Sequence, residues 1–277
     1  MSGSRGARDK PRAGRGRGKS KTQGKGSKSK SKTRLVYGVH PVVAALDRFE
    51  AGDETRRPRR LLVARDERVG EIAARAERDG ISVETVAAER LAQVCGSRSH
   101  QGIACELPLY PYVELEALLG GDGERSPLLL LVDTVTDPQN LGAMFRAALV
   151  LGATGVVLTR DRCAHVTPTV TRVSSGATEH VGCALVTNLA RTMETLAEAG
   201  VRVAVTVESG GEDPAKADLA GPLALCMGSE ERGVRPSLKA RANLLLTIPS
   251  DAPFAALNVA AATAVVVYEA ARQRRGS

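Results

Sequence analysis

The sequence predicts an α/β protein whose C-terminal half is built around a mainly parallel sheet. From residue 60 onward, short aliphatic runs alternate with segments of helical periodicity. The chain has no Trp and only 3% aromatic residues, so its core must be built from Ala, Val and Leu. The aliphatic runs are unbroken, which is typical of parallel strands that helices cover on both faces.

The N-terminal tail, residues 1–33, differs in composition from everything that follows. Residues 1–34 contain thirteen Lys or Arg and a single acid, Asp9, which gives a charge of +12. Such a segment cannot bury enough apolar surface to offset its ordering entropy, so we expect it to be disordered. Its RGRGK spacing favours an electrostatic arm for RNA over a plain solubilising tail, because each phosphate contact releases counterions.

The rest of the chain is not basic. It holds 26 basic and 30 acidic residues, a charge of −4, so the net +8 of the whole chain comes from the tail. We therefore expect any RNA-binding surface on the folded part to be a local patch.

Residues 34–106 read as a small front domain in which strands and helices alternate. The expected elements are strands at 60–65, 81–86 and 102–107 and helices at 69–79 and 87–94. Residues 107–126 carry two prolines and a Gly-Gly-Asp-Gly cluster, which predicts a linker.

Residues 127–277 show the stronger strand–helix alternation and form the second predicted domain. We expect strands at 128–132, 155–159, 180–186, 201–207, 223–228 and 243–249. The helices between and after them are expected at 140–152, near 167–175, at 188–200 and at 258–273.

Several other classes of site and location are disfavoured. The chain has no GxGxxG, GxxxxGK[ST] or GxSxG motif, so dinucleotide, P-loop and esterase sites are not supported. Its five cysteines are scattered, which argues against a metal site and a disulfide framework and fits the cytoplasm. We expect no secretory signal, and the run 260–267 is too short to span a membrane.

Three loops that follow buried strands carry polar residues that a plain turn does not need. The first, VDTVTDPQNLGAMFRAA (132–148), contains Asn140 as a possible helix cap, Gly142 for close backbone approach, and Arg146 six residues after Asn140. A capping role and a surface charge are the plain structural readings of Asn140 and Arg146.

The second loop lies in LCMGSEERGV (225–234) and the third in LLLTIPSDAPFAALNVAAATAVVVYEAAR (244–272). In the second, a strand ends at Gly228 and Glu230 follows, which places a carboxylate at the carboxyl end of the sheet, where open α/β sheets bind ligands. In the third, Asn258 opens a helix rich in small residues. A solvated acidic turn and a simple N-cap are the alternatives.

Together these three segments resemble the three sequence motifs of the SpoU (TrmH) family in the SPOUT superfamily. The front domain is similar to the auxiliary domain of bacterial 23S ribosomal RNA guanosine-2′-O-methyltransferases. That second similarity rests on YGVHPVVAAL (37–46) and SHQGIACEL (99–107). In the C-terminal half, VTDPQNLGA (135–143), TNLARTM (187–193) and YEAARQR (268–274) resemble the same subgroup.

The resemblance implies a deep trefoil knot in the C-terminal domain and a ribosomal-protein-L30e-like fold for the front domain. It implies S-adenosylmethionine as methyl donor, held by loops with Gly228, Ile248 and Leu257. The expected substrate is RNA, most simply a guanosine of 23S rRNA. The family acts as a homodimer whose active site is completed across the interface.

By the same resemblance, Arg146 contacts the ribose 2′-oxygen or the adjacent phosphate. Asn140, Glu230 and Asn258 would fix Arg146, the substrate and the cofactor loop by hydrogen bonds. An Arg is a poor base, so orientation suits it better than proton abstraction. The third motif departs from the family pattern, because Ala256 and Ala260 stand where Ser is usual.

Other functions remain open beside ribose methylation of 23S rRNA. The chain could be an RNA-binding pseudo-enzyme of the same fold. A tRNA ribose methyltransferase typically lacks the separate front domain, whereas an antibiotic-resistance rRNA methyltransferase has one. A small-molecule enzyme is disfavoured by the basic tail and the front domain.

Overall fold

The computed structural model describes residues 33–120, 126–252 and 257–276. The disorder expected of the tail and the substituted position Ala256 lie outside the described residues. The other substituted position, Ala260, lies in the first turn of the last helix, where its backbone N–H donates to the Asn258 side chain at 2.9 Å.

The N-terminal part contains a four-stranded mixed sheet in the order β1-β4-β2-β3. The strands are β1 (Thr33–Tyr37), β2 (Arg60–Val63), β3 (Ser82–Thr85) and β4 (Ile103–Pro108). Only β2 and β3 pair in parallel, and β4 pairs antiparallel with β1 and β2. Strand β1 was not predicted, because a five-residue strand next to the basic tail carries too little periodicity.

Helices cover both faces of this sheet. They are α1 (Val39–Glu50), α2 (Glu67–Arg78) and α3 (Ala88–Cys95), with a short 3₁₀ turn, η1 (Glu54–Arg56), after α1. Val42 of α1 and Val69 of α2 share one buried cluster, whereas Leu91 of α3 packs in a second. The predictions of α2 and α3 are confirmed, and α1 was missed.

Part of the segment expected to be a linker is structured. Val113 forms a parallel bridge with Ala184, and α4 (Leu115–Leu119) follows directly. Leu118 of α4 is buried in the larger domain's core. This short helix was not predicted, because the prolines and glycines on either side of α4 make the composition look like that of a linker.

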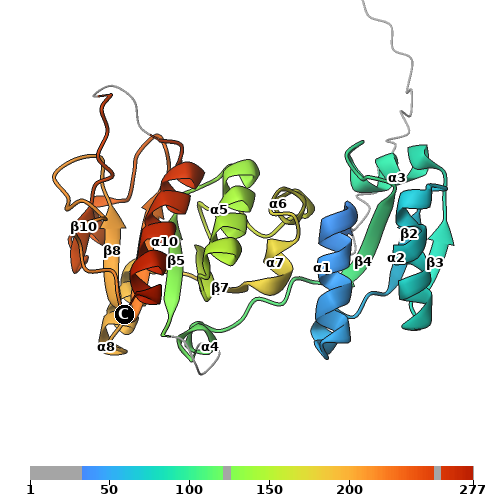
Figure 1. Ribbon diagram of the computed structural model, residues 1–277, viewed down its shortest axis with the longest axis horizontal. Coiled ribbons are helices and arrows are strands. Elements are labelled where there is room, and N and C mark those ends of the chain that lie inside the picture. Colours follow the sequence, from blue (N-terminus) through green and yellow to red (C-terminus); the bar gives the residue numbers. More distant parts are fainter. Residues whose placement is uncertain (1–32, 121–125, 253–256, 277) are drawn as a thin grey trace, which may run out of the picture. The chain divides into compact units, whose positions relative to one another are not determined.

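The second sheet has six strands, all paired in parallel, in the order β10-β8-β9-β5-β6-β7 (Figure 1). They are β5 (Leu128–Asp133), β6 (Gly155–Thr159), β7 (Gly182–Val186), β8 (Arg202–Thr206), β9 (Leu223–Gly228) and β10 (Leu244–Leu246). The expectation of a mainly parallel sheet is therefore confirmed, with β6 and β9 at the predicted residues.

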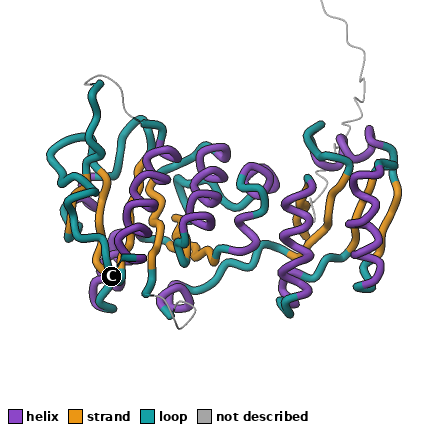
Figure 2. Tube along the Cα trace, viewed as in Figure 1, coloured by secondary structure: helices purple, strands orange, loops and turns teal. Residues whose placement is uncertain are grey.

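Helices lie on both faces of this sheet as well (Figure 2). They are α5 (Pro138–Leu151), α6 (Pro168–Val173), α7 (Ala177–His180), α8 (Leu189–Glu198), α9 (Pro236–Lys239) and α10 (Val259–Arg275). Leu128 and Leu130 of β5 pack in one cluster with α5 and α10, and Leu129 packs in the other with α8 and α9. Since both faces are covered, every residue of β5 is buried, which explains the unbroken aliphatic run.

Two predicted helix starts have different outcomes. Asn258 caps α10 as expected, accepting a hydrogen bond from the Ala260 N–H. The prediction that Asn140 caps α5 is wrong, because Asp137 is the cap and accepts from the Gln139 N–H at 3.0 Å. Pro138 occupies the first helical turn, where its missing N–H costs nothing, so the helix starts two residues earlier than expected.

Candidate active site

The three polar loops meet at the carboxyl edge of the parallel sheet. Strands β5 and β9 are neighbours, with Asp133 in register with Gly228, so the loops that follow them begin side by side. Helix α10 packs along α5, and Figure 1 shows the two helices next to each other. The first turns of α5 and α10 therefore lie close to the loop that follows β9.

Asn140, Glu230 and Asn258 form one hydrogen-bonded cluster at this edge. The Asn140 amide donates to Glu230 Oε1 at 3.1 Å, and the Asn258 amide donates to Asn140 Oδ1 at 3.0 Å. The Asn258 amide also makes a short contact with Glu230 Oε1. The backbone N–H of Val259 donates to the same oxygen at 3.3 Å.

The cluster ties three segments that are far apart in the chain. Glu230 Oε1 receives donors from the first turn of α5 and from the start of α10, while the carboxylate itself belongs to the loop after β9. A charged acceptor forms stronger hydrogen bonds with its donors than a neutral acceptor does. The exposed cluster thus sets the relative position of the three loops without closing them from solvent.

Arg146 does not belong to this cluster. Six residues along an α-helix correspond to a rotation of about 240°, so Arg146 and Asn140 point to different sides of α5. The Arg146 side chain is exposed, and among the described residues it forms no hydrogen bond or ion pair with Asn140, Glu230 or Asn258. The expectation that these three residues fix Arg146 directly is not met within a single chain.

Gly228 lies where no side chain fits. A Cβ at this position would stand 2.1 Å from the Gly233 carbonyl carbon and 2.2 Å from the Val234 nitrogen. The loop returns on itself through a hydrogen bond from the Gly233 N–H to the Ser229 carbonyl at 2.8 Å, and Gly233 adopts a φ of +60°. The loop after β9 is therefore tightly closed against Gly228.

The loops that follow β8 and β10 are joined to each other by hydrogen bonds at the same edge of the sheet as the loop after β9. Thr247 Oγ1 accepts from the Gly211 N–H at 2.9 Å, and the Thr247 N–H donates to the Glu212 carbonyl at 2.9 Å. Ile248 is half-buried against the core, and Leu257 is 52% exposed. Backbone groups in these loops and the apolar side chains of Ile248 and Leu257 are the kinds of group that an adenosine-containing cofactor needs, for hydrogen bonds and for the surface of its base.

A buried ion pair beside the site, Asp133 with Arg235, was not predicted from the sequence. Asp133, the last residue of β5, is fully buried and accepts from the Arg235 backbone N–H at 3.0 Å and from Arg235 Nε at 2.8 Å. It anchors the far end of the loop that contains Gly228 and Glu230. An acid at the end of a wholly apolar run, LLLLVD, was the available signal, because a buried carboxylate requires partners.

Two absences apply to the described residues. In that part of the chain, no group of three or more His, Cys, Asp or Glu side chains could hold a metal ion. No helix there is long and apolar enough to cross a membrane.

Two family models match this chain. The SpoU rRNA methylase family model matches residues 127–268, and a model described as the RNA 2′-O ribose methyltransferase substrate-binding domain matches residues 35–113.

The chain belongs to the SpoU rRNA methylase family.

As a member, it is an RNA 2′-O-methyltransferase with S-adenosylmethionine as its methyl donor. The resemblance identified from the three loops and the front domain is thereby confirmed.

Curated relatives match over most of the chain. The 23S rRNA (guanosine-2′-O-)-methyltransferase RlmB of Ralstonia nicotianae is 40% identical over 211 residues, which cover 76% of this chain and 84% of the relative. The protein of the same name from Pectobacterium atrosepticum is 36% identical over 253 residues, covering 88% and 100%. An uncharacterised tRNA/rRNA methyltransferase of Synechocystis is 38% identical, and the match covers 87% of this chain but only 62% of that relative.

Solved structures agree on the fold. The SpoU methyltransferase AviRb from Streptomyces viridochromogenes, crystallised with AdoMet, superposes with a TM-score of 0.74 at 24% identity. The superposition covers 89% of this chain and 92% of that one. At this identity the likeness concerns the fold.

Proposed function

We propose that this family member transfers a methyl group from S-adenosylmethionine to the ribose 2′-oxygen of a guanosine in 23S rRNA. The observation that carries the proposal is the cluster of Asn140, Glu230 and Asn258, which joins all three polar loops at one edge of the sheet. The guanosine and the 23S rRNA come from the names of the relatives, two of which are RlmB proteins at 36–40% identity.

The residues of this chain would mainly position the reactants. The bound cofactor supplies an activated methyl group on a positively charged sulfur. Gly228, Ile248 and Leu257 would hold it, the first through bare backbone and the other two through apolar contact. Since the sulfonium loses its charge as the methyl leaves, the site needs alignment more than a strong electrophile.

Arg146 would orient the nucleotide. Its guanidinium would donate hydrogen bonds to the 2′-oxygen or the neighbouring phosphate, and it keeps its proton because an Arg is a poor base. As the new oxygen–methyl bond forms and the sulfur–methyl bond breaks, S-adenosylhomocysteine leaves and the hydroxyl proton passes to solvent water at this exposed site. Asn140, Glu230 and Asn258 hold the loops around the reaction, so a small displacement of their cluster would misalign the attacking oxygen.

We further propose a homodimer whose interface includes Arg146. Leu149 and Val150, at the end of α5, are 38% and 70% exposed, and Arg146 lies one turn before them on the same outward face. On the adjacent α10, Val265 and Tyr268 are 43% and 53% exposed. Exposed apolar side chains gathered on two adjacent helices mark an interaction surface, and a second copy is its simplest occupant. In such a dimer, Arg146 would reach the cluster of the partner subunit.

The remaining features follow from family membership. We propose that the C-terminal domain is a deep trefoil knot, an arrangement supported by α10 packing on α5 and β9 after the chain has left edge strand β10. We assign the front domain, residues 34–106, an L30e-like fold and RNA binding, and we place the protein in the cytoplasm.

Mapping of ribose methylation tests the proposal. Total rRNA and tRNA from cells with and without this gene should differ at one guanosine of 23S rRNA, and the purified chain should restore that methylation in vitro. Binding of RNA and cofactor without any methylation would identify a pseudo-enzyme. A lost methyl group in tRNA, or a gain of antibiotic resistance, would place the substrate elsewhere.

A further inference from the structure

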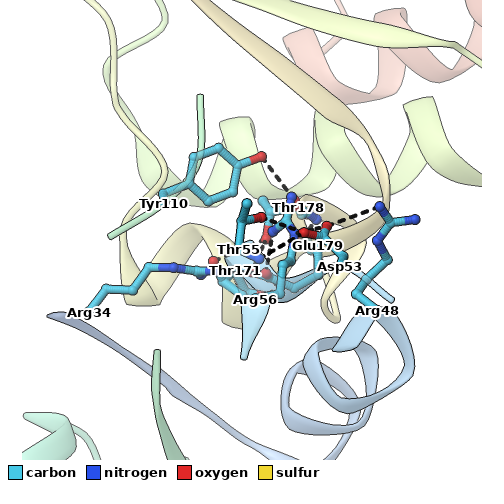
Figure 3. A network of polar contacts seen from close by, with 10 residues as sticks. Arg34, Arg48, Asp53, Thr55, Arg56, Tyr110, Thr171, Thr178 and Glu179 are labelled. Carbon is cyan, nitrogen blue, oxygen red and sulfur yellow. Dashed lines mark hydrogen bonds and ion pairs between the residues drawn. The ribbon is translucent and has the colours of Figure 1, made fainter. Parts of the chain in front are cut away.

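A fully buried carboxylate connects the two sheet-containing parts of the chain. Glu179 lies on the four-residue helix α7 with no exposed side-chain surface. Arg34 of β1 reaches it through two parallel hydrogen bonds, Nη1 to Oε1 at 2.7 Å and Nη2 to Oε2 at 2.6 Å. Arg56 of η1 makes a third, short contact with Oε2 (Figure 3).

Further contacts complete the surroundings of Glu179. Thr178 Oγ1 lies 3.3 Å from Glu179 Oε1, and Tyr110 donates its hydroxyl to the Thr178 carbonyl at 2.9 Å. The guanidinium groups of Arg34 and Arg56 lie 5.2 and 5.4 Å from the centre of the Tyr110 ring, within range for cation–π attraction. Burial raises the pKa of Glu179, but the two arginines outweigh it and hold the pKa below its ordinary value.

A buried cluster of this kind adds little net stability. Its main effect is to favour one arrangement of the segments that carry Arg34, Arg56 and Glu179. Taking charges out of water costs as much as their attraction returns, yet removing one partner leaves an unpaired buried charge. Any motion that separates Arg34 and Arg56 from Glu179 has the same consequence. The docked arrangement, in which Arg34 and Arg56 contact Glu179, is therefore favoured over any arrangement that breaks these contacts and keeps all others.

The backbone near Glu179 is too closely packed for the front domain to slide along α6 and α7. Gly176 has a φ of +86°, and a Cβ there would lie 2.7 Å from the Ala44 Cβ of α1. Arg172 of α6 donates from Nε to the Ser99 carbonyl at 2.8 Å. Helix α6 in turn packs closely on α5, since a Cβ on Gly142 would lie 2.6 Å from the Val173 Cβ. The contacts continue from β1 and η1 through α7 and α6 to the helix that carries Asn140 and Arg146.

We propose that Glu179, together with Arg34 and Arg56, is a positioning residue that locks the front domain to α6 and α7. RNA held by the front domain would then reach Arg146 and the cluster at one fixed distance and orientation. This inference rests on the proposed function, because it requires the front domain to bind RNA. Glu179 acts through the docked arrangement and touches neither substrate nor cofactor.

The test compares Glu179→Gln with Glu194→Gln in the full-length chain. Glu194 is a matched control, because it pairs with Arg241 at 2.8 Å on the surface of the same domain. Donor and acceptor dyes at the exposed positions Glu77 and Glu198 report the distance between the two parts by single-molecule energy transfer. Steady-state kinetics on a 23S rRNA fragment give KM and kcat, and calorimetry gives the Kd of S-adenosylmethionine.

We expect a narrow distance distribution for the wild type and for Glu194→Gln, and a broad one for Glu179→Gln. If the docked fraction falls to about one tenth, KM for RNA rises about tenfold while kcat and the cofactor Kd stay within about twofold. A merely structural residue would lower all activities with the folded fraction and leave the KM of the remaining enzyme unchanged. A narrow distribution or an unchanged KM in Glu179→Gln would overturn the proposal.

Two further measurements keep the inference testable on its own. If Glu179→Gln does not fold, Arg34→Lys replaces the two-pronged contact by a single donor and keeps the charge. It should broaden the distance distribution and raise KM, and wild-type behaviour in both would overturn the lock. The dye measurement needs no catalysis, so a wild-type chain that is docked but methylates no rRNA would refute the proposed function and leave the lock standing.

Discussion

Asn258 donates from its side-chain amide to Oδ1 of Asn140 at 3.0 Å, although 118 residues separate them in the chain. The bond is possible because α10 returns across the sheet to pack on α5. Glu230 completes the cluster from a third loop. One oxygen of its carboxylate accepts hydrogen bonds from Asn140 and Asn258, so it connects all three family motifs.

Glu230→Ala should therefore lower kcat by about 10²-fold, because the donors on α5 and α10 lose their common acceptor and the three loops lose alignment. Single-turnover methylation measures the effect. Glu231→Ala is the matched control, since Glu231 is the exposed neighbour on the same loop. Equal rates for both variants would show that the cluster does not matter for the reaction.

Arg146→Ala should reduce methyl transfer by about 10²–10⁴-fold and leave the cofactor Kd and the unfolding midpoint nearly unchanged. Arg146 is exposed and makes no contact within the cluster, so its removal costs little folding energy. Arg68→Ala, which removes an arginine that pairs with Asp66 on the surface, serves as control. Full turnover by Arg146→Ala would remove Arg146 from the reaction.

Gly228→Ala should abolish measurable binding of S-adenosylmethionine, because its Cβ would lie within 2.3 Å of three backbone atoms of the returning loop. Gly70→Ala is the contrasting substitution. Gly70 lies inside α2 with open space around it, so the change should raise the unfolding free energy by about 0.5–1 kcal/mol. Calorimetric titration and thermal melts measure both, and cofactor binding by Gly228→Ala would contradict the closed-loop geometry.

Asp133→Asn should weaken cofactor binding and cost about 1–3 kcal/mol of stability, because Arg235 and its backbone N–H lose a buried charged acceptor. Asp218→Asn removes a comparable contact at the surface, a 3.2 Å pair with Arg202, and should change neither quantity measurably. Urea unfolding and calorimetry distinguish the two variants. If Asp133→Asn behaves like its surface control, Asp133 does not anchor the cofactor loop.

The pH dependence of stability should carry the signature of Glu179. Its pKa in the folded chain is held below the ordinary value of 4.5, so its charged form stabilises the fold above pH 4.5. That contribution is lost as pH falls below 4.5 through the folded pKa. The unfolding free energy of the wild type should then decline more steeply than that of Glu179→Gln, by up to about 1.4 kcal/mol per pH unit. Glu194→Gln should follow the wild type, and parallel curves for Glu179→Gln would contradict the assigned charge state.

Most of the second sheet could be predicted from local patterns. The strand over residues 155–159 and the strand over 223–228 match β6 and β9, because a buried parallel strand shows as an unbroken aliphatic run between turn residues. The front part was harder. β1 and α1 were not predicted, and neither was α4, which lies among prolines and glycines. Short elements are stabilised by tertiary contacts more than by their own propensity.

The sequence by itself determined the α/β class, the order of the strands along the chain, and the three polar loops at their carboxyl ends. These follow from hydrophobic periodicity and turn residues, which act over a few neighbouring positions. Only the tertiary structure decided that Glu230 Oε1 gathers Asn140 and Asn258, that Arg146 points away from them, and that Glu179 is buried between two arginines. Such pairings depend on the spatial order β10-β8-β9-β5-β6-β7, which brings distant segments together and which no local pattern encodes.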